Sequence, residues 1–259
     1  MKREDPPRIG REGASGAMKR GTAMGYWQRL LTFNASRYRL HREIQAYAAT
    51  IPSGSLVLDA GAGIAPYRSF FQHARYESAD FEKVEKAYAP STYVCDLQSI
   101  PVEDGRFDFI ILTQVLEHVP EPRLVLAELY RVLKLGGVML CSAPLCYEEH
   151  EQPYDFYRYT QFGLRHLLNS AGFVVDRLDW LEGYLGTAGY QLNTMARYLP
   201  RQAHALGGGV VGYGAGILLS LVKLGFALCS ILFQRLETRI KYEERGYPKN
   251  YIALVHKAI

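Results

Sequence analysis

Cysteine is scarce in this sequence and never stands in a metal-binding or disulfide pattern. The four cysteines of the 259 residues form no C-x-x-C pair, and none has histidines beside it at zinc spacing. We therefore expect no bound metal. The cysteines lie mostly in apolar runs, as Cys229 does, and this predicts reduced core residues in a cytosolic protein.

No strong charge of either sign is present. The 30 basic and 26 acidic residues leave a net charge of +4, and no basic patch is interleaved with aromatic residues. This argues against nucleic acid as the main partner. Residues 1–25 also lack an apolar stretch that could serve as a signal peptide, and their polar, Gly/Pro-rich composition predicts disorder.

Strand-like and helix-like runs alternate after this segment, so residues 26–259 are expected to form one α/β domain. The predicted architecture is a doubly wound, mostly parallel sheet of seven strands, with an apolar helical insertion at 190–245 before the last strand. The expected strands are 55–60, 76–79, 92–95, 107–112, 138–143, 173–180 and 251–256. The expected helices are 26–50, 122–134 and 161–171, the last capped by Thr160.

Two glycines, Gly61 and Gly63, directly follow the first strand, where a tight turn lets backbone approach a ligand. A nicotinamide dinucleotide site would place a third glycine or an alanine where this chain has Pro66, and no GK[ST] phosphate loop is present. Asp59 precedes the turn. Its carboxylate suits a cationic amino group better than a pyrophosphate.

Two further aspartates stand at the ends of the next strands. Asp80 lies 19 residues beyond Gly61, where an open α/β sheet places a carboxylate that can accept both ribose hydroxyls. Asp96 ends the third strand, within reach of an adenine amino group. Each aspartate alone is equally well a helix cap or turn residue, but three at successive strand ends favour a nucleoside site.

The stretches VLDAGAG, SADFE, CDLQSIPVEDGRFDFIILTQVLEHV and LYRVLKLGGVML, in this order, resemble the class I S-adenosylmethionine-dependent methyltransferases, specifically the type 11 group. The resemblance covers roughly residues 56–173. It implies a Rossmann-like methyltransferase fold with S-adenosylmethionine as cofactor. One departure is that the family often has a third glycine where this chain reads Ile64-Ala65.

The resemblance also implies a set of cofactor residues. Those at the methionine end are Asp59, Gly61 and Gly63. Asp80 would hold the ribose, and Asp96 and Leu97 would bracket the adenine. Thr113 and Gln114 would lie close to the sulfonium.

Methyl transfer from a sulfonium is an in-line displacement, so the protein aligns donor and acceptor and, for some acceptors, removes a proton. His118 and His150 follow strands on the expected cofactor side and are candidate bases. For His118 the favoured alternative is a loop histidine hydrogen-bonded to backbone.

His150 lies in the polar, aromatic loop EEHEQPYDFYRYT, which is a candidate acceptor site. The candidate acceptor residues are Tyr154, Asp155, Tyr157 and Arg158. The alternative is a structural loop in which Arg158 pairs with Asp155 or a glutamate. Bacterial members of the family often carry a similar H-x-x-P-x-D-x-x-R-x-T stretch, and the resemblance associates it with cell-surface glycan or lipid-linked substrates.

The insertion contains an apolar run at 206–233 that is interrupted by one charge, Lys223. As a helix it would be about 42 Å long, enough to cross a bilayer. A single crossing would separate the last strand from its sheet, and two crossings need roughly 40 apolar residues. Two interpretations remain, a monotopic hairpin or interfacial helix and a lid packed over the active site. Contact with a membrane surface or a lipidic substrate is favoured over a helical pair, broken at the glycines, that covers the core or a dimer interface.

Basic residues flank the run on both sides, which is consistent with two cytoplasmic, lipid-facing ends. They are Arg197 and Arg201 before it and Arg235, Arg239, Lys241 and Arg245 after it. The predicted function is therefore methylation of oxygen or nitrogen on a small or lipid-linked acceptor. The predicted location is the bacterial cytoplasm, with peripheral or monotopic attachment to the cytoplasmic face of the membrane. The alternatives are a non-catalytic cofactor-binding protein and an NAD(P)-dependent oxidoreductase.

Overall fold

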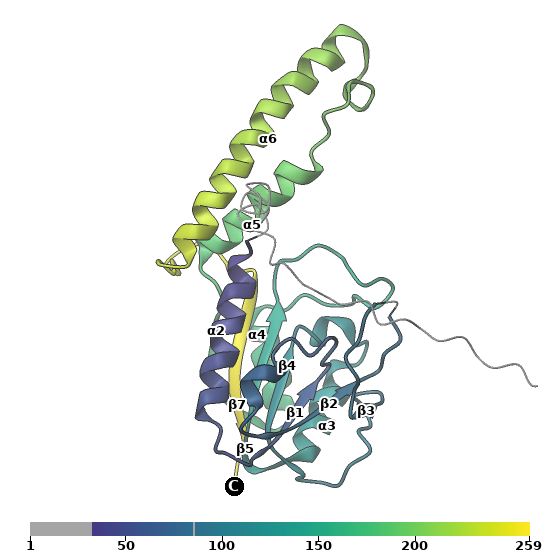
Figure 1. The fold of residues 1–259 in the computed structure, drawn as a ribbon, viewed down its shortest axis with the longest axis vertical. Helices are drawn as coiled ribbons and strands as arrows, with labels where there is room; N and C mark the ends of the chain where they lie inside the picture. Colours follow the sequence, from purple (N-terminus) through teal and green to yellow (C-terminus); the bar gives the residue numbers. More distant parts are fainter. Residues whose placement is uncertain (1–32, 85) are drawn as a thin grey trace, which may run out of the picture. The chain divides into compact units, whose positions relative to one another are not determined.

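The computed structural model describes residues 33–84 and 86–259. The expectations of disorder at 1–25 and of helix at 26–32 lie outside the described residues. Among those described, residues 34–259 form one unit around a seven-stranded sheet (Figure 1). The strands are β1 (Leu56–Ala60), β2 (Arg75–Asp80), β3 (Tyr93–Val94), β4 (Phe107–Thr113), β5 (Leu133–Pro144), β6 (Phe173–Trp180) and β7 (Asn250–Lys257).

The sheet has the order β3-β2-β1-β4-β5-β7-β6. The first five strands pair in parallel, and β7 runs antiparallel to both β5 and β6. This confirms the predicted doubly wound, mostly parallel sheet. Strand order reverses at β1, which places the crevice for a ligand at the carboxyl end of that strand and of β4.

Helices cover both faces of the sheet, because the central strands are buried on both sides. Leu58 of β1 packs in the core beneath α3 (Pro122–Val132) and α4 (Gln161–Ser170). Val57, one residue earlier, points to the opposite core beneath α2 (Ala35–Thr50). Short 3-10 turns complete the framework: η1 (Arg68–Phe71), η2 (Leu116–His118) and η3 (Ala203–Leu206).

The helix ends follow local capping chemistry, with one correction. Asn34 caps α2, and Thr160 caps α4 by accepting a hydrogen bond from the Gly163 amide, as predicted. The helix expected through Lys134 instead ends at Val132. Leu133 has extended backbone angles and pairs with Phe107 of β4, so strand pairing ends the helix before the glycines.

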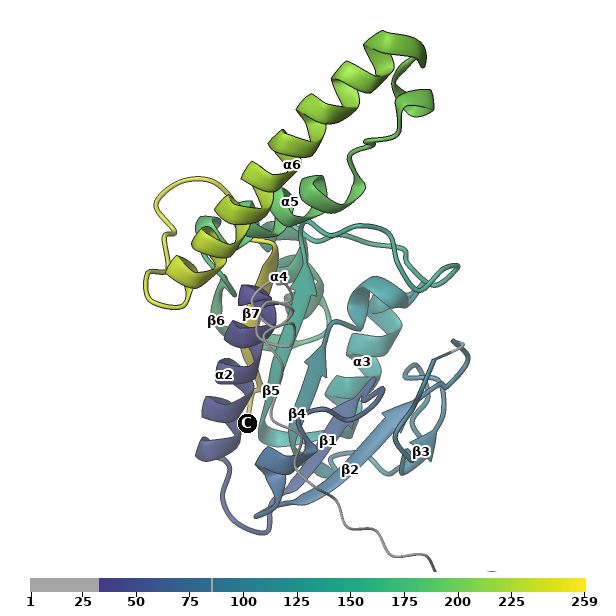
Figure 2. The same ribbon diagram turned by 45° about the horizontal axis from the view of Figure 1, so that its top comes forward.

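The apolar insertion folds as a helical hairpin of α5 (Tyr184–Tyr198) and α6 (Gly209–Glu237), with η3 between them (Figure 2). The glycines do not break α6, so the break proposed in the helical-pair alternative is wrong, although α5 and α6 do form a pair of helices. By length and composition α6 could cross a membrane, yet only 11% of its most apolar window is buried. Cys229 is exposed on this helix, which corrects its expected place in the core.

The C-terminal end of α6 is fixed to the rest of the protein. Glu237 is fully buried and accepts hydrogen bonds from the amides of Gly183 and Gly186, at 2.8 and 3.1 Å, and it pairs with Arg39 of α2. Gln234 accepts a hydrogen bond from the Ala35 amide at 3.0 Å. These polar contacts anchor the hairpin base to the helix that covers the sheet.

The N-terminal half of α6 packs against the chain that leads into it. Gly212 and Gly216 lie one turn apart, and a Cβ at either would collide with the carbonyl oxygen of Ala203 or Arg201. The opposite side of the helix is covered by exposed apolar side chains: Val210, Val211, Tyr213, Ile217, Leu218, Leu221, Leu224, Leu228 and Leu232. Lys223 is the single charge of the apolar run 206–233. Its ammonium donates hydrogen bonds to the carbonyl oxygens of Arg197 and Leu199, at the C-terminal end of α5.

Candidate active site

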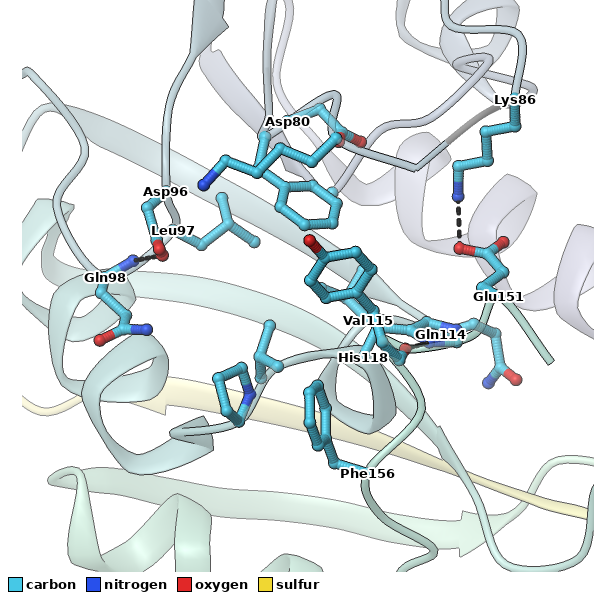
Figure 3. A pocket seen from close by; sticks show the side chains of 16 residues that line it. Asp80, Lys86, Asp96, Leu97, Gln98, Gln114, Val115, His118, Glu151 and Phe156 are labelled. Carbon is cyan, nitrogen blue, oxygen red and sulfur yellow. Dashed lines mark hydrogen bonds and ion pairs between the residues drawn. The ribbon is translucent and has the colours of Figure 1, made fainter. Parts of the chain in front are cut away.

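A pocket lies at the carboxyl ends of β1, β2 and β4 (Figure 3). Asp80, Asp96 and Leu97 line one side of it, and His118 and Phe156 stand on the other. Leu97 is buried and Asp96 is exposed, two residues beyond the end of β3. The structure therefore brings the predicted ribose and adenine residues to one pocket.

Asp80 is the last residue of β2 and is only 5% exposed. Its Oδ2 accepts a hydrogen bond from the Gly63 amide at 2.8 Å, and its Oδ1 accepts one from the Glu82 amide at 3.2 Å. The carboxylate thus ties the end of the second strand to the turn after the first.

The turn after β1 depends on two small residues. Gly61 has φ +75°, and a Cβ there would overlap the Val115 side chain. Ala65, in the Ile64-Ala65 pair where the family often has a third glycine, has φ +48°. The alanine takes the left-handed conformation that a glycine favours, and the turn keeps its form at a modest backbone cost.

Asp59 is buried at the end of this strand, with 3% of its surface exposed. Burial raises its pKa to about 7, the Tyr76 hydroxyl lowers it by donating a hydrogen bond to the carboxylate, and the charge of Asp80 raises it further. A cationic amino group beside this carboxylate would replace its lost hydration.

A second, larger cavity of about 640 Å³ adjoins the first. The two share Gly61, Lys86, Gln114 and Glu151 in their linings, so they lie side by side. Thr113 and Gln114, at the end of β4, line the larger cavity, and Gln114 has φ +56° with its side-chain amide donating to Ser142 Oγ at 3.1 Å. The size of the second cavity leaves room for an acceptor.

Sequence reasoning missed part of this larger cavity. Arg37 and His41 of α2 line it, together with Tyr147 and with Lys249, the residue before β7. No motif marks these positions, because an α2 residue and the start of the last strand meet only through the fold. The missed residues make this end of the cleft basic and aromatic.

His118 and His150 lie together beside the cleft, with ring centroids 4.6 Å apart. His118 Nδ1 bonds the Tyr154 carbonyl oxygen at 2.5 Å, which matches the alternative of a loop histidine held by backbone. His150 lines the larger cavity, and its amide donates to Asp155 at 2.8 Å. His150 is therefore the better placed of the two to meet an acceptor.

Glu117 completes a group of three possible metal ligands with these histidines. Its carboxylate is fully buried, and both oxygens lack a hydrogen-bond partner among the described residues. The donor atoms all lie within 4.8 Å of one another, and His118 Nε2 is 3.9 Å from Glu117 Oε1. The expectation of no metal stays a prediction.

The four candidate acceptor residues have different surroundings. Tyr154 lines the cofactor pocket. Arg158 pairs with Asp155 at 2.6 Å and donates to the Tyr147 and Glu148 carbonyls, and the Tyr157 hydroxyl donates to the Pro120 carbonyl. These three residues are not among the lining of either cavity. The contacts of Asp155 and Arg158 fit the structural alternative, in which the ion pair shapes the loop.

Comparison with known families decides the class. A family model described as "Methyltransferase domain" matches residues 33–178, more than half of the chain. The chain is a class I S-adenosylmethionine-dependent methyltransferase. The methyltransferase uses S-adenosylmethionine, and the adjoining cavities fit that molecule because each is lined by a buried carboxylate, Asp80 in one and Asp59 in the other.

Two curated relatives match parts of the methyltransferase. A tRNA (carboxymethyluridine(34)-5-O)-methyltransferase from Xenopus tropicalis is 30% identical over 54% of this chain and 23% of its own length. An uncharacterized methyltransferase from a Mycobacterium species is 29% identical over 61% of this chain and 71% of its own. The match thus spans about a quarter of the first relative and most of the second.

Solved structures share the fold at low identity. A [4+2]-cyclase, SpnF, superposes with a TM-score of 0.52 at 18% identity, covering 85% of this chain and 81% of its own. A Haemonchus contortus phosphoethanolamine N-methyltransferase in complex with S-adenosyl-L-methionine gives 0.51 at 14% identity, covering 92% and 58%. These likenesses concern the architecture alone.

Proposed function

We propose that this methyltransferase methylates oxygen or nitrogen of a small or lipid-linked acceptor at a membrane surface. The observation that carries the proposal is the larger cavity, which adjoins the cofactor pocket and reaches from the glycine turn to Tyr147 and Lys249. There Tyr190 of α5 stacks on Tyr147, which lines the cavity, with ring centroids 5.6 Å apart. An acceptor presented along the hairpin would enter beside these rings.

In this proposal the strand-end residues hold the cofactor, whose sulfonium supplies a methyl group open to in-line displacement. Asp59 binds the amino group, and Gly61 and Gly63 let backbone approach the methionine end. Asp80 accepts hydrogen bonds from the ribose hydroxyls, while Asp96 and Leu97 bracket the adenine. Thr113 and Gln114 lie beside the sulfonium.

We assign His150 as the group that receives the acceptor's proton, with His118 beside it. The support is the position of His150 in the wall of the larger cavity, which the glycine turn also lines. We expect His150→Gln to lower kcat at least tenfold on an acceptor that must lose a proton. The affinity for S-adenosylhomocysteine should stay within twofold of that of the original protein. Equal losses of kcat and of this affinity would instead mean that His150 supports the fold of the cleft.

Membrane contact is proposed through α6. Its exposed apolar side chains face away from the hairpin, with Ile217 68% and Leu221 64% exposed, and its one lysine is satisfied internally. The hairpin base is basic in sequence, so an anionic bilayer is the partner that matches both apolar surface and charge. A shallow, monotopic insertion leaves the last strand on the same side as its sheet.

We expect the purified protein to sediment with vesicles that contain phosphatidylglycerol and to sediment more weakly with pure phosphatidylcholine vesicles. A variant with the three changes Ile217→Gln, Leu221→Gln and Leu228→Gln should stay in the supernatant. Each buried leucine or isoleucine contributes roughly 1.5–3 kcal/mol, so the bound fraction should fall at least tenfold. A matched control is Leu124→Gln with Leu135→Gln, two exposed apolar residues outside the hairpin. Equal sedimentation of both variants would sink the membrane proposal.

Incubation with methyl-labelled S-adenosylmethionine and a bacterial membrane extract tests the proposed activity. We expect label in the organic phase after solvent extraction. Label in the aqueous phase alone would point to a small soluble acceptor. Binding of S-adenosylhomocysteine without transfer to either phase would favour the rival, a non-catalytic cofactor-binding protein, and binding of NADH instead would favour an oxidoreductase.

A further inference from the structure

The end of the larger cavity beside the hairpin base carries positive charge that the described residues leave without an ionic partner. Lys249 lies there, 5% exposed, with its ammonium 4.2 Å from the ring centroids of both Tyr147 and Tyr190. Arg37 of α2 lines the same cavity. Among the residues that the structure describes, neither side chain forms an ion pair or a hydrogen bond.

The backbone holds Lys249 rigidly in this position. Its carbonyl oxygen accepts hydrogen bonds from the amides of Leu145 and Cys146, and its own amide donates to the buried carboxylate of Glu182. Glu182 also accepts from the Asn250 amide at 2.7 Å. Asn250 Nδ2 donates to its other oxygen at 3.2 Å, so both carboxylate oxygens are hydrogen-bonded, and Glu182 does not line the cavity.

The other charged groups of this cavity are accounted for. Glu151 pairs with Lys86 at 2.7 Å, and Asp59 stands at the cofactor end. The remaining groups of the lining, His41 and His150, supply no negative charge. Glu148 and Glu182 act on Lys249 from outside the lining. Within the lining, the hairpin end of the cavity has cations and no carboxylate of its own, an arrangement that a multiply charged anion would balance.

Burial costs such a cation heavily unless something compensates. Desolvation lowers the pKa of Lys249 to about 8, Glu182 opposes this fall, and the charge of Arg37 adds to it. The two tyrosine rings stabilise the ammonium through cation-π contacts but cannot neutralise it. Two cations that line the same cavity match the charge of a phosphate.

Building on the proposed function, we infer that Lys249 and Arg37 form an anion subsite that binds a phosphate group of the acceptor. The phosphate would anchor the acceptor at the hairpin end of the cleft while its oxygen or nitrogen reaches toward the glycine turn. The phosphate of a membrane lipid and that of a free phosphorylated metabolite share this chemistry, so the test must separate them.

The test titrates the full chain, with and without S-adenosylhomocysteine, with inorganic pyrophosphate and with dihexanoyl phosphatidic acid below its micelle concentration. We expect saturable binding of at least one probe, weakened at least tenfold in Lys249→Met and in Arg37→Gln. Arg37 is exposed, so its variant reports on the site even if Lys249→Met fails to fold. Lys134→Met, a lysine paired with Asp108 away from the cleft, should bind as the original protein does.

The outcomes separate the two proposals. Binding of phosphatidic acid alone assigns the site to a lipid headgroup, and binding of both probes assigns it to phosphate of either source. No binding of either probe, or binding that survives both substitutions, overturns the subsite. The affinity of the full chain for S-adenosylhomocysteine is measured separately. If the full chain does not bind S-adenosylhomocysteine, this counts against the proposed methyl transfer and not against the anion site.

Discussion

Replacement of Asp80 by alanine should weaken binding of S-adenosylhomocysteine at least 100-fold. The buried carboxylate would accept hydrogen bonds from the ribose, and hydrogen bonds to a charged group contribute about 1.5–3 kcal/mol each. The change also removes the acceptor for the Gly63 amide, so the glycine turn loses a contact that shapes it. Calorimetric titration of the purified variant measures the loss.

Asp104→Ala is the matched control, because Asp104 is an exposed aspartate that pairs with Arg131 outside the cleft. It should bind as the original protein does. A folded Asp80→Ala protein with an affinity within threefold of the original would show that the pocket at the β2 end does not hold the ribose.

Affinity for S-adenosylhomocysteine should fall as the pH drops below 7. The raised pKa of Asp59 means that its carboxyl gains a proton near pH 7 in the free protein, and the ligand's ammonium group needs the ionised form. The ligand keeps its own charge in this range. Once Asp59 is mostly protonated, affinity should fall about tenfold for each further pH unit, since one unit of pKa corresponds to roughly 1.4 kcal/mol.

Two variants check the origin of this pH dependence. Tyr76→Phe removes the hydrogen bond that lowers the pKa of Asp59, so the fall should begin at a higher pH. Asp59→Asn should bind weakly at every pH and should show a flat profile between pH 5.5 and 8. A profile in Asp59→Asn that still falls below pH 7 would assign the effect to another group.

The sheet and its cofactor edge could be predicted from sequence because their signals are local. The first strand is apolar, glycines follow it, and aspartates stand at the ends of the next two. These local signals are enough to place Asp59, Gly61 and Asp80 at the cofactor edge without knowledge of tertiary contacts. The predicted end of α3 was two residues too late, because Leu133 pairs with β4 and does not continue the helix. Only the assembled sheet determines this pairing.

The acceptor end could not be predicted in the same way. Lys249 and Arg37 are more than 200 residues apart in sequence and meet in one cavity only because β7 inserts between β5 and β6. The loop after β5 was singled out from composition, yet Asp155 and Arg158 are occupied by each other. Polar residue types mark a loop as a candidate, while their partners decide whether the side chains remain available to a ligand.

The place of β7 in the sheet has a consequence for synthesis. This strand lies between β5 and β6 but follows α6 in the chain, so a ribosome makes the hairpin before the sheet can close. The cleft therefore lacks Lys249 and its last wall until the final strand has been made. A chain terminated after α6 would keep the glycine turn but would leave the β5 edge unpaired and the acceptor end of the cleft incomplete.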